Sequence, residues 1–138
     1  MFDVAKTAVD AARKAGAEFA DARAGVDETE SLTVRNQEME GIDRSTSTGV
    51  GIRVLVGGRW GFAATSRLDE AEIDRTARLA VEMARAAQRL PGDPVSLTPV
   101  EPAKASWRTS VKEDPFTVPL EEKVALLMEA SRVMQGVP

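Results

Sequence analysis

Apolar and polar residues alternate along residues 19–65, and this is the period of a half-buried β-strand. In the clearest run, every second residue is aliphatic and lies on one face: Val50, Ile52, Val54 and Val56. Gly57 and Gly58 follow, and they allow the positive φ angles of a two-residue hairpin turn. The returning strand puts Trp60, Phe62 and Ala64 on one face. We expect the two aromatic side chains to lie in the core, over alanine-rich helices.

Three shorter stretches show the same alternation before this hairpin, at residues 19–27, 32–35 and 39–45. The polar segment Asn36–Glu38 marks a turn between the second and third of them. We therefore predict an antiparallel sheet of about four strands.

Helical periods flank the predicted sheet. A narrow stripe of small apolar residues predicts a helix that starts at a capping Asp3 and stops at Gly16. A second helix starts at Asp69, whose capping-box partner is Glu72, and a third starts near Pro119. The apolar stripe of the third helix is Leu120, Val124, Leu127, Met128 and Met134. The predicted fold is α+β with helices packed on one face of the sheet, in the order α-β-β-β-β-α, then a Pro-rich arm and a C-terminal helix.

Six of the seven prolines fall within residues 91–119, where the hydrophobic period disappears. We expect residues 1–92 to form an α+β N-terminal domain and residues 93–118 to form a Pro-rich linker or arm. Residues 119–138 then form a helix that leads to a C-terminal domain absent from this sequence. Trp107 lies in the arm, and we expect its indole to anchor the arm to the folded body rather than to bind a partner.

Composition excludes several kinds of chemistry. The formal net charge is -4, and no cluster of Lys and Arg is free of acidic residues, so nucleic acid binding is disfavoured. The sequence has no cysteine and no histidine, which rules out thiolate metal sites, Ser-His triads and HExxH zinc sites within it. No stretch approaches the roughly 20 apolar residues of a membrane span. We expect a cytoplasmic protein that binds neither nucleic acid nor membrane.

Four residues are candidate peptide contacts. Gly49 and Gly51 alternate with aliphatic residues, without the spacing of a phosphate-binding loop, and they allow a helix or a peptide backbone to approach the strand closely. Arg35 and Asn36 stand beside a turn, where they either hydrogen-bond an extended peptide or are a surface arginine and a turn asparagine. The acidic residues between Asp27 and Asp43 fit a solvated strand face better than a metal site. We predict no catalytic and no metal-binding residue.

Four motifs follow one another at a particular spacing: Ser31–Asn36, Glu40–Gly41, Gly49–Val56 and Trp60–Thr65. Together they resemble the N-terminal domain of the TldD/PmbA (modulator of DNA gyrase) metalloprotease family. The resemblance implies a domain joined to a larger β-rich domain, homo- or heterodimers, and zinc-dependent cleavage of peptides or unfolded polypeptide. It also implies that the zinc ligands, from a HExxxH helix and a later cysteine, lie downstream of the matched part.

The resemblance leads to a functional expectation. The chain is expected to serve assembly and substrate gating in a TldD/PmbA-type zinc metallopeptidase, without being catalytic alone. Its expected partners are a TldD/PmbA-type subunit and a peptide or unfolded polypeptide substrate. The alternative is a free-standing domain that binds a peptide or a partner without hydrolysis. A reading frame that continues to a HExxxH motif would exclude this alternative.

Overall fold

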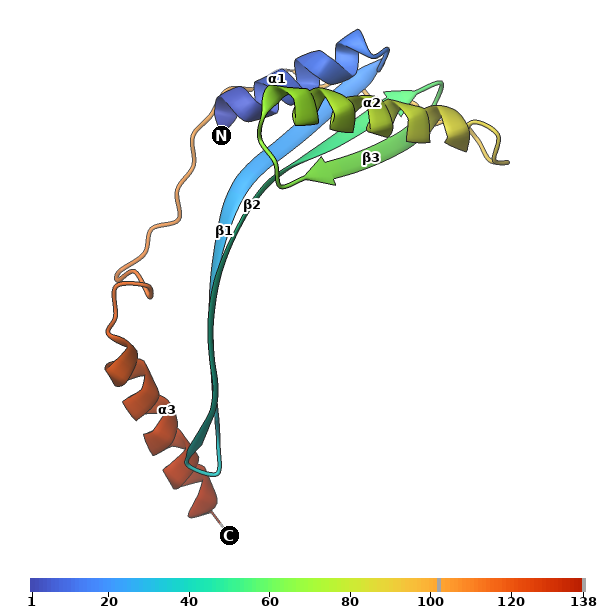
Figure 1. Cartoon of the computed structure of the whole chain (residues 1–138). Helices are drawn as coiled ribbons and strands as arrows, with labels where there is room; N and C mark the ends of the chain where they lie inside the picture. Colours follow the sequence, from blue (N-terminus) through green and yellow to red (C-terminus); the bar gives the residue numbers. More distant parts are fainter. Residues whose placement is uncertain (102, 138) are drawn as a thin grey trace. The chain divides into compact units, whose positions relative to one another are not determined.

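The computed structural model describes residues 1–101 and 103–137, and these contain three helices and three strands. In chain order they are α1 (Phe2–Lys14), β1 (Phe19–Arg35), β2 (Glu38–Val56), β3 (Arg59–Thr65), α2 (Glu70–Ala87) and α3 (Leu120–Gln135) (Figure 1). The strands form one antiparallel sheet in the order β1-β2-β3. The predicted α+β class is confirmed, although the described residues form three strands instead of about four.

The strand number differs because β1 and β2 are long and continuous, with 17 and 19 residues. The polar stretches that separate the predicted strands lie inside them, where both faces of the ribbon are largely exposed. A strand without a buried face needs no alternating apolar side chains. Asn36 and Gln37 form the turn between β1 and β2, with φ angles of 50° and 63°. This two-residue turn with positive φ at both positions confirms the predicted turn.

Internal contacts divide the chain into two compact units. Unit 1 contains residues 1–27 and 47–100, and unit 2 contains residues 28–46 together with the described residues from 101 onward. The long strands β1 and β2 contribute to both units. No helix in the described part of the chain has both the length and the apolar character needed to cross a bilayer.

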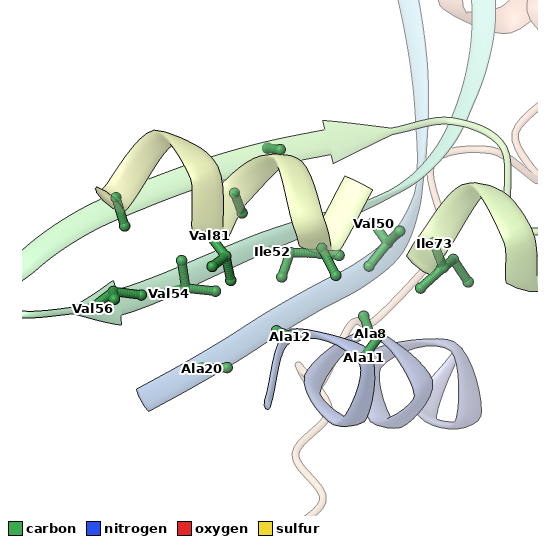
Figure 2. Close-up of a cluster of buried hydrophobic side chains, with 14 residues drawn as sticks. Ala8, Ala11, Ala12, Ala20, Val50, Ile52, Val54, Val56, Ile73 and Val81 are labelled. Carbon is green, nitrogen blue, oxygen red and sulfur yellow. The ribbon is translucent and has the colours of Figure 1, made fainter. Parts of the chain in front are cut away.

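The core of unit 1 lies between the sheet and the helices α1 and α2 (Figure 2). The predicted aliphatic face of β2 is confirmed, since Ile52 and Val54 are fully buried. Small residues bring the layers close together. A Cβ atom on Gly61 of β3 would lie 2.0 Å from the carbonyl oxygen of Ala80 in α2, so only glycine fits at this position.

The aromatic residues of β3 lie on the opposite face of the sheet, and the prediction that they line the core is wrong. Val54 lies directly opposite Gly61 in the β2–β3 register. Residues directly opposite in antiparallel strands share a face, so Gly61 points to the core and its neighbours Trp60 and Phe62 point away from it. Phe62 is accordingly 57% exposed.

The two helix starts in unit 1 differ in their capping. At α2 the Asp69 carboxylate accepts a hydrogen bond of 3.0 Å from the backbone N–H of Glu72, as the capping pattern predicts. At α1 the N-cap position is Met1, without a side-chain hydrogen bond, so the predicted cap at Asp3 is wrong. Asp3 lies in the first turn, where its charge is favourable to the helix dipole.

Hydrogen bonds to backbone groups hold the beginning of the arm on unit 1. The N–H of Val95 donates to the carbonyl of Gly58 at 2.9 Å, and the Arg59 side chain donates to the carbonyls of Leu90, Gly92 and Asp93. Trp107 is 84% exposed, so the prediction that its indole anchors the arm is wrong. Arg59 holds the beginning of the arm instead.

In unit 2 the predicted C-terminal helix is present as α3, beside the β1–β2 turn. The Ser131 hydroxyl accepts a hydrogen bond of 3.0 Å from the backbone N–H of Gln37. Lys123 of α3 forms an ion pair with Glu30 of β1, and both side chains are largely shielded from solvent. Polar contacts therefore fix the turn to the helix.

Candidate functional site

The face of the unit 1 sheet that points away from α1 and α2 carries aromatic rings, charges and glycines. We call it the open face. Its members are Phe19, Asp21 and Arg23 of β1, Gly49, Gly51 and Arg53 of β2, and Trp60 and Phe62 of β3. Alternation along each strand places them together, because every second side chain points to the same side.

Two hollows, of about 500 and 370 Å³, indent the open face. Arg23, Gly51 and Phe62 line both of them. These volumes fall in the range of binding pockets for small ligands, but both hollows are open to solvent. Their shape suits a side chain or a stretch of extended backbone better than an enclosed small molecule.

Two glycines of β2 determine how close other groups approach this face. A Cβ atom on Gly51 would lie 3.1 Å from the ring of Phe62, and one on Gly49 would lie 3.1 Å from the carbonyl oxygen of Thr65. The Phe62 ring therefore packs where Gly51 has no side chain, and the β3 backbone approaches closely where Gly49 has none. Both glycines line the larger of the two hollows.

Arg53 is at the centre of the polar and aromatic contacts of the open face. Its Nε and Nη2 atoms donate to one carboxylate oxygen of Asp21, at 2.9 and 2.5 Å. Its guanidinium lies 4.8 Å from the ring centroid of Trp60, and the Trp60 and Phe19 rings meet edge to face with their centroids 6.0 Å apart.

Arg23, the second arginine of the open face, has no ion-pair partner among the described residues. Its charge is available to a ligand.

Arg35 and Asn36 belong to unit 2, at the tip of the β1–β2 hairpin. The Nε atom of Arg35 lies 3.3 Å from the carboxylate of Glu40, and the arginine side chain is 72% exposed. Asn36 has a positive φ and accepts a hydrogen bond of 3.4 Å from the amide of Gln135. The structure therefore brings Gly49 and Gly51 together in one hollow, and it places the other two candidate contacts in a different unit.

Sequence reasoning missed the arginines of the open face, Arg23 and Arg53. The signal was present in the period of two, since Arg53 alternates with the buried residues Ile52 and Val54 and so points to the same side as Gly51. Neither arginine attracts notice in the sequence, because a single charge on an exposed strand face is common.

The residues of this chain do not fit the zinc that the resemblance implies. Among the described residues, no three or more His, Cys, Asp or Glu side chains gather in a way that would hold a metal ion. Several carboxylates are paired with arginines instead. Glu28 lies 2.6 Å from Arg44, and this hydrogen bond raises the pKa of the Arg44 guanidinium above its ordinary value. No catalytic step through zinc follows from these residues.

Comparison with protein families gives the assignment. Residues 20–84, which include every residue of the open face except Phe19, match the sequence profile of the PmbA/TldA metallopeptidase domain 1. Over these residues the chain is similar to the TldD/PmbA family. Over 117 residues it is 25% identical to a metalloprotease of Methanocaldococcus jannaschii, and the match covers 85% of this chain and 26% of that protein. A metalloprotease of Methanothermobacter thermautotrophicus is 30% identical over 113 residues, or 82% of this chain and 24% of that protein.

Two solved structures share the fold of this chain. A candidate modulator of DNA gyrase from Bacteroides thetaiotaomicron has a TM-score of 0.74 at 19% identity, and TldE from Thermococcus kodakarensis has a TM-score of 0.66 at 17% identity. Each match covers 95% of this chain, and 30% and 29% of the two solved chains. The chain spans about a quarter of the length of the curated relatives it matches.

Proposed function

We propose that this chain is the N-terminal accessory domain of a TldD/PmbA-type zinc metallopeptidase that acts on peptides or unfolded polypeptide. Its role is assembly and substrate gating, in a cytoplasmic homo- or heterodimer with a TldD/PmbA-type subunit. The match of residues 20–84 to the first domain of a metallopeptidase family supports this role. The sequence contains neither histidine nor cysteine, so the zinc of TldD-type members would be held by a downstream domain.

The open face is the observation that carries the gating role. Phe62 is a large apolar side chain with 57% of its surface exposed, and it lies next to a cation, Arg23, that has no ion-pair partner among the described residues. Aromatic rings and arginines at the centre of a surface are the residue types that contribute most to binding. An unfolded chain on its way to a catalytic site meets both kinds of contact here.

The alternative function is a free-standing domain that binds a peptide or a partner without hydrolysis. The same exposed aromatic and cationic side chains favour it, because they need no catalytic group to bind a polypeptide. The two functions differ in whether the complete reading frame that contains these residues encodes a zinc site.

The test uses the protein encoded by that complete reading frame, with Phe62→Ser introduced on the open face. We expect the variant to cleave an unfolded polypeptide about five times more slowly, because it loses one aromatic contact with the bound polypeptide, and such a contact contributes binding energy of this order. Cleavage of a short chromogenic peptide is expected to stay unchanged, since a short peptide reaches the zinc site without the open face. The measurement is the ratio of the two kcat/KM values.

Leu90→Ser is the matched control, because Leu90 is also an exposed large apolar residue of unit 1 but lies outside the open face. It should leave both rates unchanged. An equal fall of both rates in Phe62→Ser, or no fall in either, would contradict the gating role.

A further inference from the structure

A groove runs between helix α1 and the outer edge of strand β1, within unit 1. Its volume is about 540 Å³, and apolar surface predominates in its lining. Phe2, Ala5 and Val9 of α1 form one wall, and Ala20 and Ala22 of β1 form the floor. Figure 1 shows α1 beside β1 at this end of the sheet. The open face is on the other side of the sheet, and of its members only Asp21 also lines the groove.

The edge of β1 along this groove is unpaired. β1 is the first strand in the sheet order, so β2 occupies only one of its two sides. Among the described residues, no backbone N–H or C=O from outside the sheet bonds to residues 19–27. Alternate backbone groups of an edge strand point outward and can bind another extended chain. The groove therefore offers a row of donors and acceptors beside an apolar wall.

The other edge of the sheet, at β3, is less suited to an apolar chain. The hollow beside it is smaller, about 290 Å³, and apolar surface makes up a smaller share of its lining than in the β1 groove, although each lining contains four charged residues. β3 has only 7 residues, whereas the unit 1 part of β1 is longer. An incoming strand finds a longer edge and a more apolar wall at β1.

The charges around the β1 groove leave one cation available. Asp10 is paired with Lys6 at 3.2 Å, and Asp21 is paired with Arg53 on the open face. The Arg13 side chain lines the groove and has no ion-pair partner among the described residues. A carboxylate on the bound chain would complement this charge.

The position of Arg13 sets the direction of the bound chain. α1 runs from Phe2 to Lys14, and after a short turn β1 starts at Phe19 and runs back (Figure 1). Arg13 therefore lies beside the start of β1. A strand added antiparallel to β1 would end at this point, with its C-terminal residues next to the guanidinium.

We propose that an extended polypeptide segment adds to the outer edge of β1 as an antiparallel strand, with apolar side chains against Phe2 and Val9 and a carboxylate at Arg13. Backbone hydrogen bonds provide affinity that is largely independent of sequence, and the wall of α1 favours apolar residues at alternate positions. This deepens the proposed function by naming a surface that receives polypeptide. It rests on that function only in identifying the bound segment as a substrate.

The test is a binding measurement on the full 138-residue chain by fluorescence anisotropy, without cleavage. The probe is a labelled peptide of about nine residues, with valine and threonine alternating and a free C-terminal carboxylate. A second probe carries N-methyl groups at alternate backbone nitrogens, which removes the donors that face β1. We expect the first probe to bind saturably and the second to bind at least about tenfold more weakly.

Phe2→Gln tests the apolar wall. Phe2 is 75% exposed, so the variant should keep the wild-type Tm and circular dichroism spectrum while it weakens binding about tenfold. Leu90→Gln is the control, because Leu90 is 64% exposed and lies outside the groove. Equal affinities of Phe2→Gln and wild type, or equal binding of the two probes, would overturn the proposal.

Arg13→Gln tests the carboxylate, with Arg89→Gln as the control on an exposed arginine outside the groove. The variant is expected to lose affinity about threefold for the free-acid peptide and to bind the C-terminal amide like wild type. An amidated peptide with a glutamate at its last position distinguishes an acidic side chain from the terminal carboxylate. If Arg13→Gln weakens all three peptides equally, the assigned carboxylate position is wrong. Absence of binding by wild type would overturn the groove but would leave the metallopeptidase proposal to the cleavage test.

Discussion

Unit 1 buries aliphatic side chains in a common core, whereas in unit 2 polar contacts join a hairpin tip to one helix beside apolar side chains that are only partly buried. All the buried hydrophobic residues among the described part of the chain lie in unit 1. In α3 the only described residue that is buried is Ser131, which accepts a hydrogen bond from the hairpin turn. The same two strands, β1 and β2, take part in both arrangements. Strand structure alone therefore does not say what stabilises a region; the side chains on each part of the strand decide it.

The largest effect should come from the centre of the unit 1 core. Ile52→Ala removes a side chain that is fully buried between the sheet and the helices, and we expect a loss of about 2–5 kcal/mol in the free energy of unfolding. Urea denaturation monitored by circular dichroism measures it. Val26→Ala, at a residue that is 54% exposed on β1, is the control and should change stability by less than about 0.5 kcal/mol. A loss below about 1 kcal/mol in Ile52→Ala would show that this core does not dominate unit 1.

Gly61→Ala tests the close packing of α2 on β3. The added Cβ atom would meet the backbone of Ala80 at 2.0 Å and that of Ala84 at 2.7 Å, and backbone atoms cannot move away as a flexible side chain does. We expect a loss of about 1–3 kcal/mol in the same denaturation experiment. Gly25→Ala is the control, because its added Cβ atom would meet nothing within 4 Å. Equal stabilities of the two variants would contradict the contact between α2 and β3.

Lys123→Gln tests whether polar contacts hold unit 2. Its partner Glu30 would remain largely shielded from water without a counter-charge, since the two side chains are only 17% and 15% exposed. We expect a loss of about 1–2 kcal/mol in unfolding free energy, between the values for exposed and buried pairs. Lys6→Gln removes an exposed ion pair with Asp10 and should cost less than about 0.5 kcal/mol. If the two variants lose equal unfolding free energy, the Glu30–Lys123 pair stabilises the fold no more than an exposed ion pair does.

The smallest effect concerns acid stability at α2. The hydrogen bond from Arg75 is the main cause that lowers the pKa of Glu72 below its ordinary value near 4.5. Because the folded-state pKa is the lower one, this carboxylate stabilises the fold above about pH 4.5, and the contribution is lost as the pH falls through the folded-state pKa. Glu72→Gln should therefore reduce the difference in Tm between pH 7 and pH 3. An unchanged difference would show that the Glu72–Arg75 pair contributes nothing to acid sensitivity.

Sequence patterns predicted the parts of the fold where burial is one-sided. The aliphatic run from Val50 to Val56 and the capping pair of Asp69 and Glu72 were correct, since period and capping chemistry are local. The lengths of β1 and β2 were not predicted, because residues 28–31 and 46–49, which are polar apart from Gly49, interrupt the apolar period while the strands continue through them. The face of Trp60 was predicted wrongly, although the two-residue turn determines the register and therefore the face.

The candidate contacts could be predicted only as separate residues. Gly49 and Gly51 were noticed because glycine is unusual in a strand, and the structure places both in one hollow. The contribution of Arg23 and Phe62 to that hollow depends on the pairing of β2 with β3 and on the place of β1 in the sheet. The β1 groove depends on how α1 returns beside its own strand. These contacts join segments that are distant in the sequence, so the local periodicity of the sequence does not predict them.

The central claim is that this chain provides a non-catalytic domain to a metallopeptidase. The most direct measurement is cleavage of an unfolded polypeptide with added zinc, by the chain alone and by the protein encoded by the complete reading frame. We predict cleavage by the longer protein, loss of that cleavage with a chelator, and no cleavage by the chain alone. Chelator-sensitive cleavage by the chain alone would contradict the claim.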